Sequence, residues 1–210
     1  MPKTDTSEKG LERLICISLT GTACDPPLPG VVPEAAPASG STGWICGNPN
    51  DYDREYCVDL AKLRTFLRAT QPKEAEALDL DQDSPKRRSF LARLQGEISK
   101  RGVIDLLRHG VKHGPLSPDL FYGTPSPGNL VAAERYGQNR FSVTRQLRYS
   151  RDETQLALDV ALFINGLPVA TFELKNSLTK QTVEDALQQY KRDRDPREKI
   201  FEFGDRKSVV

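Results

Sequence analysis

The stretch LDVALFINGLPVATFELKN, residues 158–176, constrains the fold of this chain more than any other. It consists of two apolar runs joined by an Asn-Gly turn, a pattern that predicts a β-hairpin. Ionised groups rarely enter a sheet interior without a partner, because removing them from water is costly. Nevertheless the first run carries Asp159, and the second carries Glu173 and Lys175. We therefore expect these three charged side chains to serve a function.

Side-chain alternation separates these charged residues from the apolar ones. Successive residues of a strand point to opposite faces of the sheet. In residues 155–164 and 170–175 the even positions are apolar, whereas Asp159, Glu173 and Lys175 occupy odd positions. One face of the hairpin is therefore expected to be core. The other is expected to gather the three charged side chains beside small residues.

The length of the turn decides whether Asp159 and Glu173 meet. A two-residue loop at Asn165 and Gly166 would place Asp159 opposite Phe172, on the other face from Glu173. A three-residue connection with a left-handed Gly166 and a G1 bulge restores the match. We expect that connection, and with it two carboxylates within reach of one metal ion.

Paired carboxylates at this position indicate metal-dependent hydrolysis. Like charges a few ångströms apart stay ionised together only beside a cation, and oxygen ligands suit Mg²⁺ or Mn²⁺. Asp159 and Glu173 would hold the metal, with the Leu174 carbonyl as a candidate further ligand. Lys175 would orient a water and donate to a phosphate oxygen, which predicts phosphodiester hydrolysis. The alternative is a solvent-exposed ion pair between Glu173 and Lys175, worth under about 1 kcal/mol.

Hydrophobic periodicity places the hairpin within a chain that mixes helices and strands. Helices are expected over residues 6–19, 56–70, 85–101 and 182–192, and strands over 141–149, 154–164, 167–174 and 200–203. A Pro- and Gly-rich segment over 22–45 is expected to be either disordered or a loop insert. This order of elements predicts an α/β or α+β fold with a mixed sheet.

Composition excludes some classes of protein. A chain of 210 residues, 37% of them hydrophobic, can bury one core. Thirty Lys and Arg against twenty-nine Asp and Glu give a net charge of +1, so the overall charge indicates no nucleic-acid partner. No run is apolar enough for a membrane span and the start lacks a signal-peptide pattern, so we expect a cytoplasmic location.

Cysteine and histidine give no metal motif. The four cysteines are far apart, without a CxxC pair, and we expect reduced, structural thiols. His109 and His113 have the spacing of a helical metal pair but no third ligand nearby, so we interpret them as structural or surface residues. The basic residues of helix 85–101 either face solvent or touch phosphate.

Three motifs carry a resemblance to a known family: RQLRYS at residues 145–150, the hairpin at 158–176, and ALQQYKRDRDP at 186–196. Together they resemble the amino-terminal nuclease domain of the R (restriction) subunit of type I restriction-modification enzymes. The similarity is dense over residues 139–203 and thinner upstream, in GLERLI and RGVIDLLRHGVK.

The resemblance implies a restriction-endonuclease-like PD-(D/E)xK fold, with a mixed central sheet flanked by helices and an added amino-terminal helical part. Asp159, Glu173 and Lys175 would then hold the catalytic positions with Mg²⁺, and double-stranded DNA would be cut. Complete family members continue into an ATP-using motor and assemble with methylation and specificity subunits. No phosphate-binding G-x-x-x-x-G-K-[ST] loop occurs in these 210 residues, so ATP belongs to a part not present in them.

Further site residues follow from the same resemblance. Many members carry a Gln four residues before the helix tyrosine, but Tyr190 has Ala186 there. Either Gln189 and Tyr190 take over the DNA or active-site contact, or Tyr190 is core. Glu12 resembles an acidic helix residue that assists the metal in some nucleases of this fold. The predicted helix ends in a basic cluster, for which we expect either contacts with DNA phosphates or compensation of the helix dipole. The cluster consists of Lys191, Arg192, Arg194 and Arg197.

The last six residues, DRKSVV, match one reading frame of a common sequencing adapter. We therefore expect a domain over residues 1–204, and a non-native tail of a truncated chain over 205–210, with a core strand missing. The main hypothesis is a DNA endonuclease. The alternative is a non-catalytic or decayed fragment that only docks on DNA or a partner subunit; a repair nuclease unrelated to restriction fits the NGLP context less well.

Overall fold

The computed structural model describes residues 7–25, 43–152, 155–174, 198–203 and 208–209. Its helices are α1 (Glu8–Thr20), the 3₁₀ turn η1 (Pro49–Asp51), α2 (Leu60–Thr70), α3 (Pro72–Ala77), α4 (Pro85–Arg101), α5 (Val103–His109), α6 (Leu130–Gly137) and α8 (Lys199–Glu202). Its strands are β1 (Trp44–Cys46), β2 (Tyr52–Asp53), β3 (Val58–Asp59), β4 (Phe141–Arg148), β5 (Ala157–Ile164), β6 (Leu167–Glu173) and β7 (Ser208–Val209). Among the described residues, no helix combines the length and the apolar character that a membrane crossing requires.

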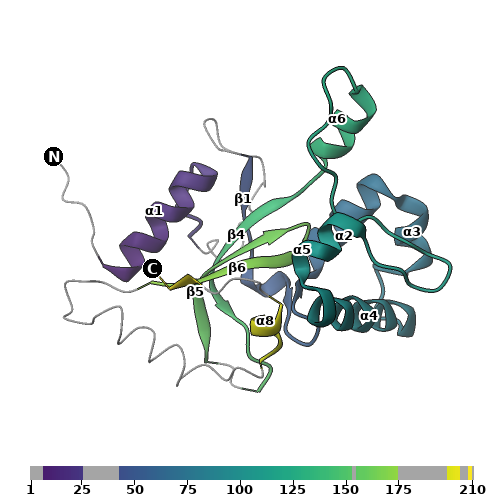
Figure 1. Ribbon diagram of the computed structural model, residues 1–210. Helices are drawn as coiled ribbons and strands as arrows, with labels where there is room; N and C mark the ends of the chain where they lie inside the picture. Colours follow the sequence, from purple (N-terminus) through teal and green to yellow (C-terminus); the bar gives the residue numbers. More distant parts are fainter. Residues whose placement is uncertain (1–6, 26–42, 153–154, 175–197, 204–207, 210) are drawn as a thin grey trace.

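The main sheet is mixed, as the sequence predicts. Its strand order is β1-β4-β5-β6-β7, and β4, β5 and β6, three of the predicted strands, form an antiparallel meander. Strands β1 and β7 join the two edges in parallel. The last residues of the predicted loop insert, 22–45, therefore belong to the sheet, where the Trp44 ring packs against the Phe141 ring at a tilt, with centroids 5.5 Å apart. Figure 1 shows the sheet between α1 and the group of helices α2 to α5.

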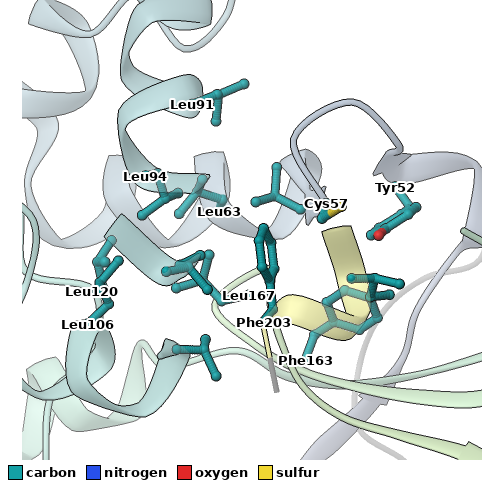
Figure 2. Close-up of a cluster of buried hydrophobic side chains, with 14 of the residues drawn as sticks. Tyr52, Cys57, Leu63, Leu91, Leu94, Leu106, Leu120, Phe163, Leu167 and Phe203 are labelled. Carbon is teal, nitrogen blue, oxygen red and sulfur yellow. The ribbon is translucent and has the colours of Figure 1, made fainter. Parts of the chain in front are cut away.

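Both faces of the hairpin are packed, which corrects the prediction of one core face and one charged face. The larger core joins Leu158 and Phe163 of β5 to side chains of α2, α4 and α5 (Figure 2). The smaller core lies beneath α1 and contains Val160. Residues two positions apart on a regular strand share a face. Leu158 and Val160 belong to different cores, so the regular alternation of side chains is interrupted at Asp159. Asp159 therefore lies at an irregularity of the sheet and not on a uniformly polar face.

The hairpin turn is shorter than predicted. It contains only Asn165 and Gly166, both left-handed with φ of 51° and 84°, which matches the twist of the flanking strands. The extra residue lies further along, at Val169 in β6, where the register with β5 shifts. Pro168 precedes it and has no N–H to give to a regular ladder, which explains a bulge there. The predicted slip of one residue is thus present, but in the strand instead of the turn.

Asn165 anchors the turn from a fully buried position. Its Nδ2 donates to the Leu120 carbonyl at 2.8 Å and to Asn139 Oδ1 at 3.0 Å. Its Oδ1 accepts the N–H of Arg140 at 2.6 Å, and its own N–H donates to the Arg140 carbonyl at 2.8 Å. The NGLP sequence is therefore a structural anchor that holds the hairpin against the loops before β4.

Serine residues cap two of the predicted helices, whereas the helix predicted over residues 56–70 begins later, at Leu60, with Val58 and Asp59 in strand β3. Ser7 begins α1 and Ser84 begins α4, each accepting a backbone N–H three residues on. Residues 200–203, predicted as a strand, instead lie largely in helix α8, with Phe201 and Phe203 buried in the larger core. A four-residue apolar run carries too little periodicity to separate a buried strand from a buried helical turn.

Cys24 and Cys46 form a disulfide, which corrects the prediction of four reduced thiols. The bond joins the segment after α1 to β1, and the two Cα atoms lie 5.3 Å apart. The sequence shows only a separation of 22 residues and gives no sign of this proximity. Cys16 and Cys57 are free and buried, and burial raises the pKa of each thiol to about 11, so both are structural as predicted.

Asp59 caps α2 from an almost fully buried position. Its Oδ1 accepts the N–H of Lys62 at 2.9 Å; its Oδ2 has no hydrogen-bond partner within the described ranges, and Lys62 Nζ lies 3.7 Å from it. Burial raises the pKa of this carboxyl above its usual value, and the Lys62 charge opposes that rise. A carboxyl with a raised pKa stabilises the fold fully below its unfolded pKa, and this stabilisation is lost as pH rises through the folded pKa.

Replacing Asp59 with asparagine is therefore expected to change the pH dependence of stability. Asparagine keeps the helix cap but does not ionise. The stability of Asp59→Asn relative to the native chain should rise between about pH 4 and about pH 7. Urea unfolding at both pH values measures it, and a difference independent of pH would contradict the assignment.

Candidate functional site

Asp159 and Glu173 stand at opposing positions on β5 and β6. The ladder between these strands pairs Val160 with Phe172, and Asp159 and Glu173 are the next residues along each strand. Opposing residues of an antiparallel pair share a face. The Leu174 N–H donates to Asp159 Oδ2 at 2.7 Å, so this carboxylate lies against the end of β6. The bulge in β6 is the feature that aligns the two acidic residues.

Glu12 of α1 accepts hydrogen bonds from two neighbouring residues of β4, one of which also contacts Asp159. Arg145 Nε donates to Glu12 Oε2 at 3.1 Å, and Gln146 Nε2 donates to Glu12 Oε1 at 2.9 Å. The same Gln146 Nε2 lies 3.4 Å from Asp159 Oδ1. We call Glu12, Arg145, Gln146 and Asp159 the Glu12 cluster. It ties α1 to the centre of the sheet.

Glu12 is the most buried acid of this cluster, with 1% of its surface exposed. Burial raises the pKa of Glu12 above its usual value, and the hydrogen bond and positive charge of Arg145 oppose the rise. The negative charge of Asp159 adds to it. Two carboxylates thus lie close enough to interact, and a cation between them would stabilise both ionised forms.

The donor chemistry fits a divalent cation that prefers oxygen. Asp159, Glu173 and Glu12 offer carboxylates, and Leu174 offers a carbonyl, the ligand types that Mg²⁺ takes. The contact between Gln146 Nε2 and Asp159 Oδ1 is long, at 3.4 Å. In the described part of the chain, no three His, Cys, Asp or Glu side chains already form a metal-binding group.

Arg145 and Gln146 receive no role in the sequence analysis, although both belong to the RQLRYS motif. A signal for Arg145 exists in the sequence, because it stands at period-two spacing between the apolar residues Val143 and Leu147. A charge at a core-facing position needs a buried partner. Gln146 carries no such signal, since its left-handed φ of 49° depends on the folded sheet.

The other predicted site residues lie outside the described part of the chain. They are Lys175, Ala186, Gln189, Tyr190, Lys191, Arg192, Arg194 and Arg197. Their roles in catalysis and in DNA contact stay predictions.

The basic face of α4 is engaged by acidic neighbours. Arg87 and Arg88 both pair with Asp83, and Arg93 and Arg101 both pair with Glu97. These partly exposed pairs favour the solvated-face alternative over contact with phosphate.

The two histidines do not lie on one helix, which agrees with their interpretation as structural or surface residues. His109 is the last residue of α5, and its Nδ1 lies 2.9 Å from Asp105 Oδ1. His113 lies beyond the helix, with its ring 5.7 Å from the ring of Phe90.

A family model described as "Type I restriction enzyme R protein N terminus" matches residues 41–209. This range is most of the chain and includes Asp159, Glu173 and the whole sheet, whereas Glu12 precedes it. Neither a curated protein nor a solved structure gave a match.

Proposed function

Because the chain belongs to the family of type I restriction enzyme R subunits, as their N-terminal domain, we propose that it is the DNA-cleaving part of such a subunit. Asp159, Glu173 and Lys175 form the catalytic group, and Mg²⁺ or Mn²⁺ is the cofactor. The observation that supports this most is the opposing placement of Asp159 and Glu173. The bulge in β6 produces it, and a regular two-residue hairpin would place Asp159 opposite Phe172 instead.

Each residue has a distinct task in the proposed reaction. A bound Mg²⁺ would supply an activated water and stabilise charge on the phosphate. Asp159 and Glu173 provide the charge that binds the cation, and the Leu174 N–H holds Asp159 Oδ2 in position. Lys175 orients the attacking water and donates to a phosphate oxygen. Glu12 adds negative charge from the buried side of the site.

The proposed substrate is double-stranded DNA. Its phosphates are contacted by the segment after β6, at Gln189, Tyr190, Lys191, Arg192 and Arg194. Such contacts position a duplex without reading its sequence. Recognition would then rest with methylation and specificity subunits, and ATP-driven translocation with a motor outside these 210 residues.

Cleavage of supercoiled plasmid by the purified chain tests the proposal. Relaxed and linear products are expected with MgCl₂ and are expected to disappear with EDTA. Asp159→Asn and Lys175→Ala should each lower the rate by about 100-fold or more, because each removes a group that acts on the transition-state charge. Asp83→Asn, at an exposed ion pair before α4, is the control and should retain the native rate.

Two results would contradict the proposal. One is cleavage that survives Asp159→Asn, which points to a contaminating nuclease. The other is a folded native chain that neither cleaves DNA nor binds Mg²⁺ by calorimetry. The second result, combined with retention of DNA in a mobility-shift assay, would support the alternative of a non-catalytic binding module.

A further inference from the structure

Gln146 has a backbone conformation that a strand residue rarely adopts. Its φ of 49° is left-handed, and the β4–β5 ladder resumes on either side of it, at Arg145–Val160 and Leu147–Leu158. The left-handed region costs a residue with a side chain about 1–2 kcal/mol. Unfavourable conformations of this kind persist where the surrounding structure holds them, and they gather at functional sites.

The side chain of Gln146 contacts both helix α1 and strand β5. Its Nε2 donates to Glu12 of α1 at 2.9 Å and contacts Asp159 of β5 at 3.4 Å. The other oxygens of these carboxylates are held by Arg145 Nε, at 3.1 Å from Glu12, and by the Leu174 N–H, at 2.7 Å from Asp159. Gln146 is thus the described residue whose one nitrogen reaches both carboxylates.

The chemistry of an amide suits this bridging position. A lysine or arginine there would neutralise the carboxylates and compete with a cation. An amide donates hydrogen bonds without adding charge, so Gln146 adds nothing to the positive charge of Arg145, which already pairs with Glu12. The bridge therefore orients both acids and leaves the charge of Asp159 available to a metal ion.

We infer that Gln146 is a positioning residue for the Mg²⁺ site, setting Asp159 and Glu12 at a fixed spacing through one side-chain amide. The inference rests on the proposed function. Its Nε2 donates to both carboxylates, so its role is to orient the oxygens that would bind the metal.

Gln146→Gly separates positioning from a purely structural role. Glycine adopts the left-handed conformation freely, so it keeps the backbone and removes only the bridge. Relief of backbone strain and loss of the hydrogen bond to Glu12 oppose each other, and the melting temperature should stay within about 5 °C of the native value. The affinity for MgCl₂, measured by calorimetry, should fall about 10- to 100-fold, as is usual when a residue orienting a ligand is removed.

Asp79→Gly is the matched control. Asp79 is also left-handed, with φ of 54°, but lies after α3, away from the Glu12 cluster. It should change the melting temperature little and leave the Mg²⁺ affinity at the native value. Gln146→Asn, which keeps an amide on a side chain one methylene shorter, should resemble Gln146→Gly in affinity.

The pattern of affinities distinguishes failure of this inference from failure of the proposed function. Native affinity in Gln146→Gly, together with lost affinity in Asp159→Asn, would overturn the positioning role and leave the metal site standing. Absence of Mg²⁺ binding by the native chain, or equal binding by Asp159→Asn, would overturn the proposed function and the inference together. A similar fall in Asp79→Gly would show that the loss follows from glycine substitution and not from the bridge.

Discussion

Replacing Arg145 with alanine is expected to lower the free energy of unfolding by about 3–5 kcal/mol, the usual loss when one partner of a buried ion pair is removed. The Glu12 side chain is 2% exposed and the Arg145 side chain 13% exposed, so neither is well solvated. Without Arg145, Glu12 would keep a buried charge, and Gln146 would be the one described residue that still donates to it. Urea unfolding at neutral pH measures the loss.

The controls for Arg145→Ala use the same acidic neighbour. Arg13 and Arg145 each place a guanidinium nitrogen 3.0 Å from Asp25 Oδ1, but Arg13 is about half exposed. Arg13→Ala should therefore cost less than about 1 kcal/mol. The double variant Glu12→Gln with Arg145→Ala should be more stable than Arg145→Ala alone, because it removes the unpaired charge. If the loss in free energy of unfolding in the double variant equalled the sum of the losses in the two single variants, the buried-pair account would be contradicted.

Acid should weaken the effect of Arg145→Ala. Burial already raises the pKa of Glu12, and removal of Arg145 takes away the main influence that lowers it. A carboxyl with a raised folded pKa stabilises the fold below its unfolded pKa and loses that contribution as pH rises through the folded pKa. The deficit of Arg145→Ala should thus be larger at about pH 7 than at about pH 4.

Replacing Gly166 with alanine is expected to destabilise the fold by about 3 kcal/mol or more, from a left-handed backbone and from overpacking. A Cβ at Gly166 would lie 2.3 Å from the Asp59 carbonyl oxygen and 2.7 Å from the Leu63 nitrogen. Both are backbone atoms of the α2 amino terminus, so no side chain can rotate away. The hydrogen bond from the Asp59 N–H to the Gly166 carbonyl, 2.8 Å, would be disturbed as well.

Gly128→Ala isolates the steric part of this effect. Gly128 has φ of 83°, almost equal to the 84° of Gly166, but a Cβ there meets nothing within 4 Å. Its substitution should cost only about 1–2 kcal/mol, the left-handed contribution. Thermal unfolding of both variants gives the comparison. Equal losses would show that the contact between the turn and α2 contributes little.

The hairpin shows how much of the candidate site can be predicted from the sequence. Period-two alternation and the Asn-Gly turn predict two strands, and both form. The requirement for an extra residue between Asp159 and Glu173 also follows from alternation alone. The sequence misplaces that residue in the turn, because the buried contacts of Asn165 that fix a two-residue turn come from loops far along the chain.

The sequence by itself determined the local elements and the family: helix caps, strand periods and the motifs around Asp159 and Glu173. These features rest on neighbouring residues, whose spacing is visible in one dimension. Only the tertiary structure decided that Cys24 meets Cys46, and that Glu12 reaches Asp159 through Gln146. Such long-range proximity depends on how α1 packs across the sheet, a sum of many weak contacts that no local pattern records.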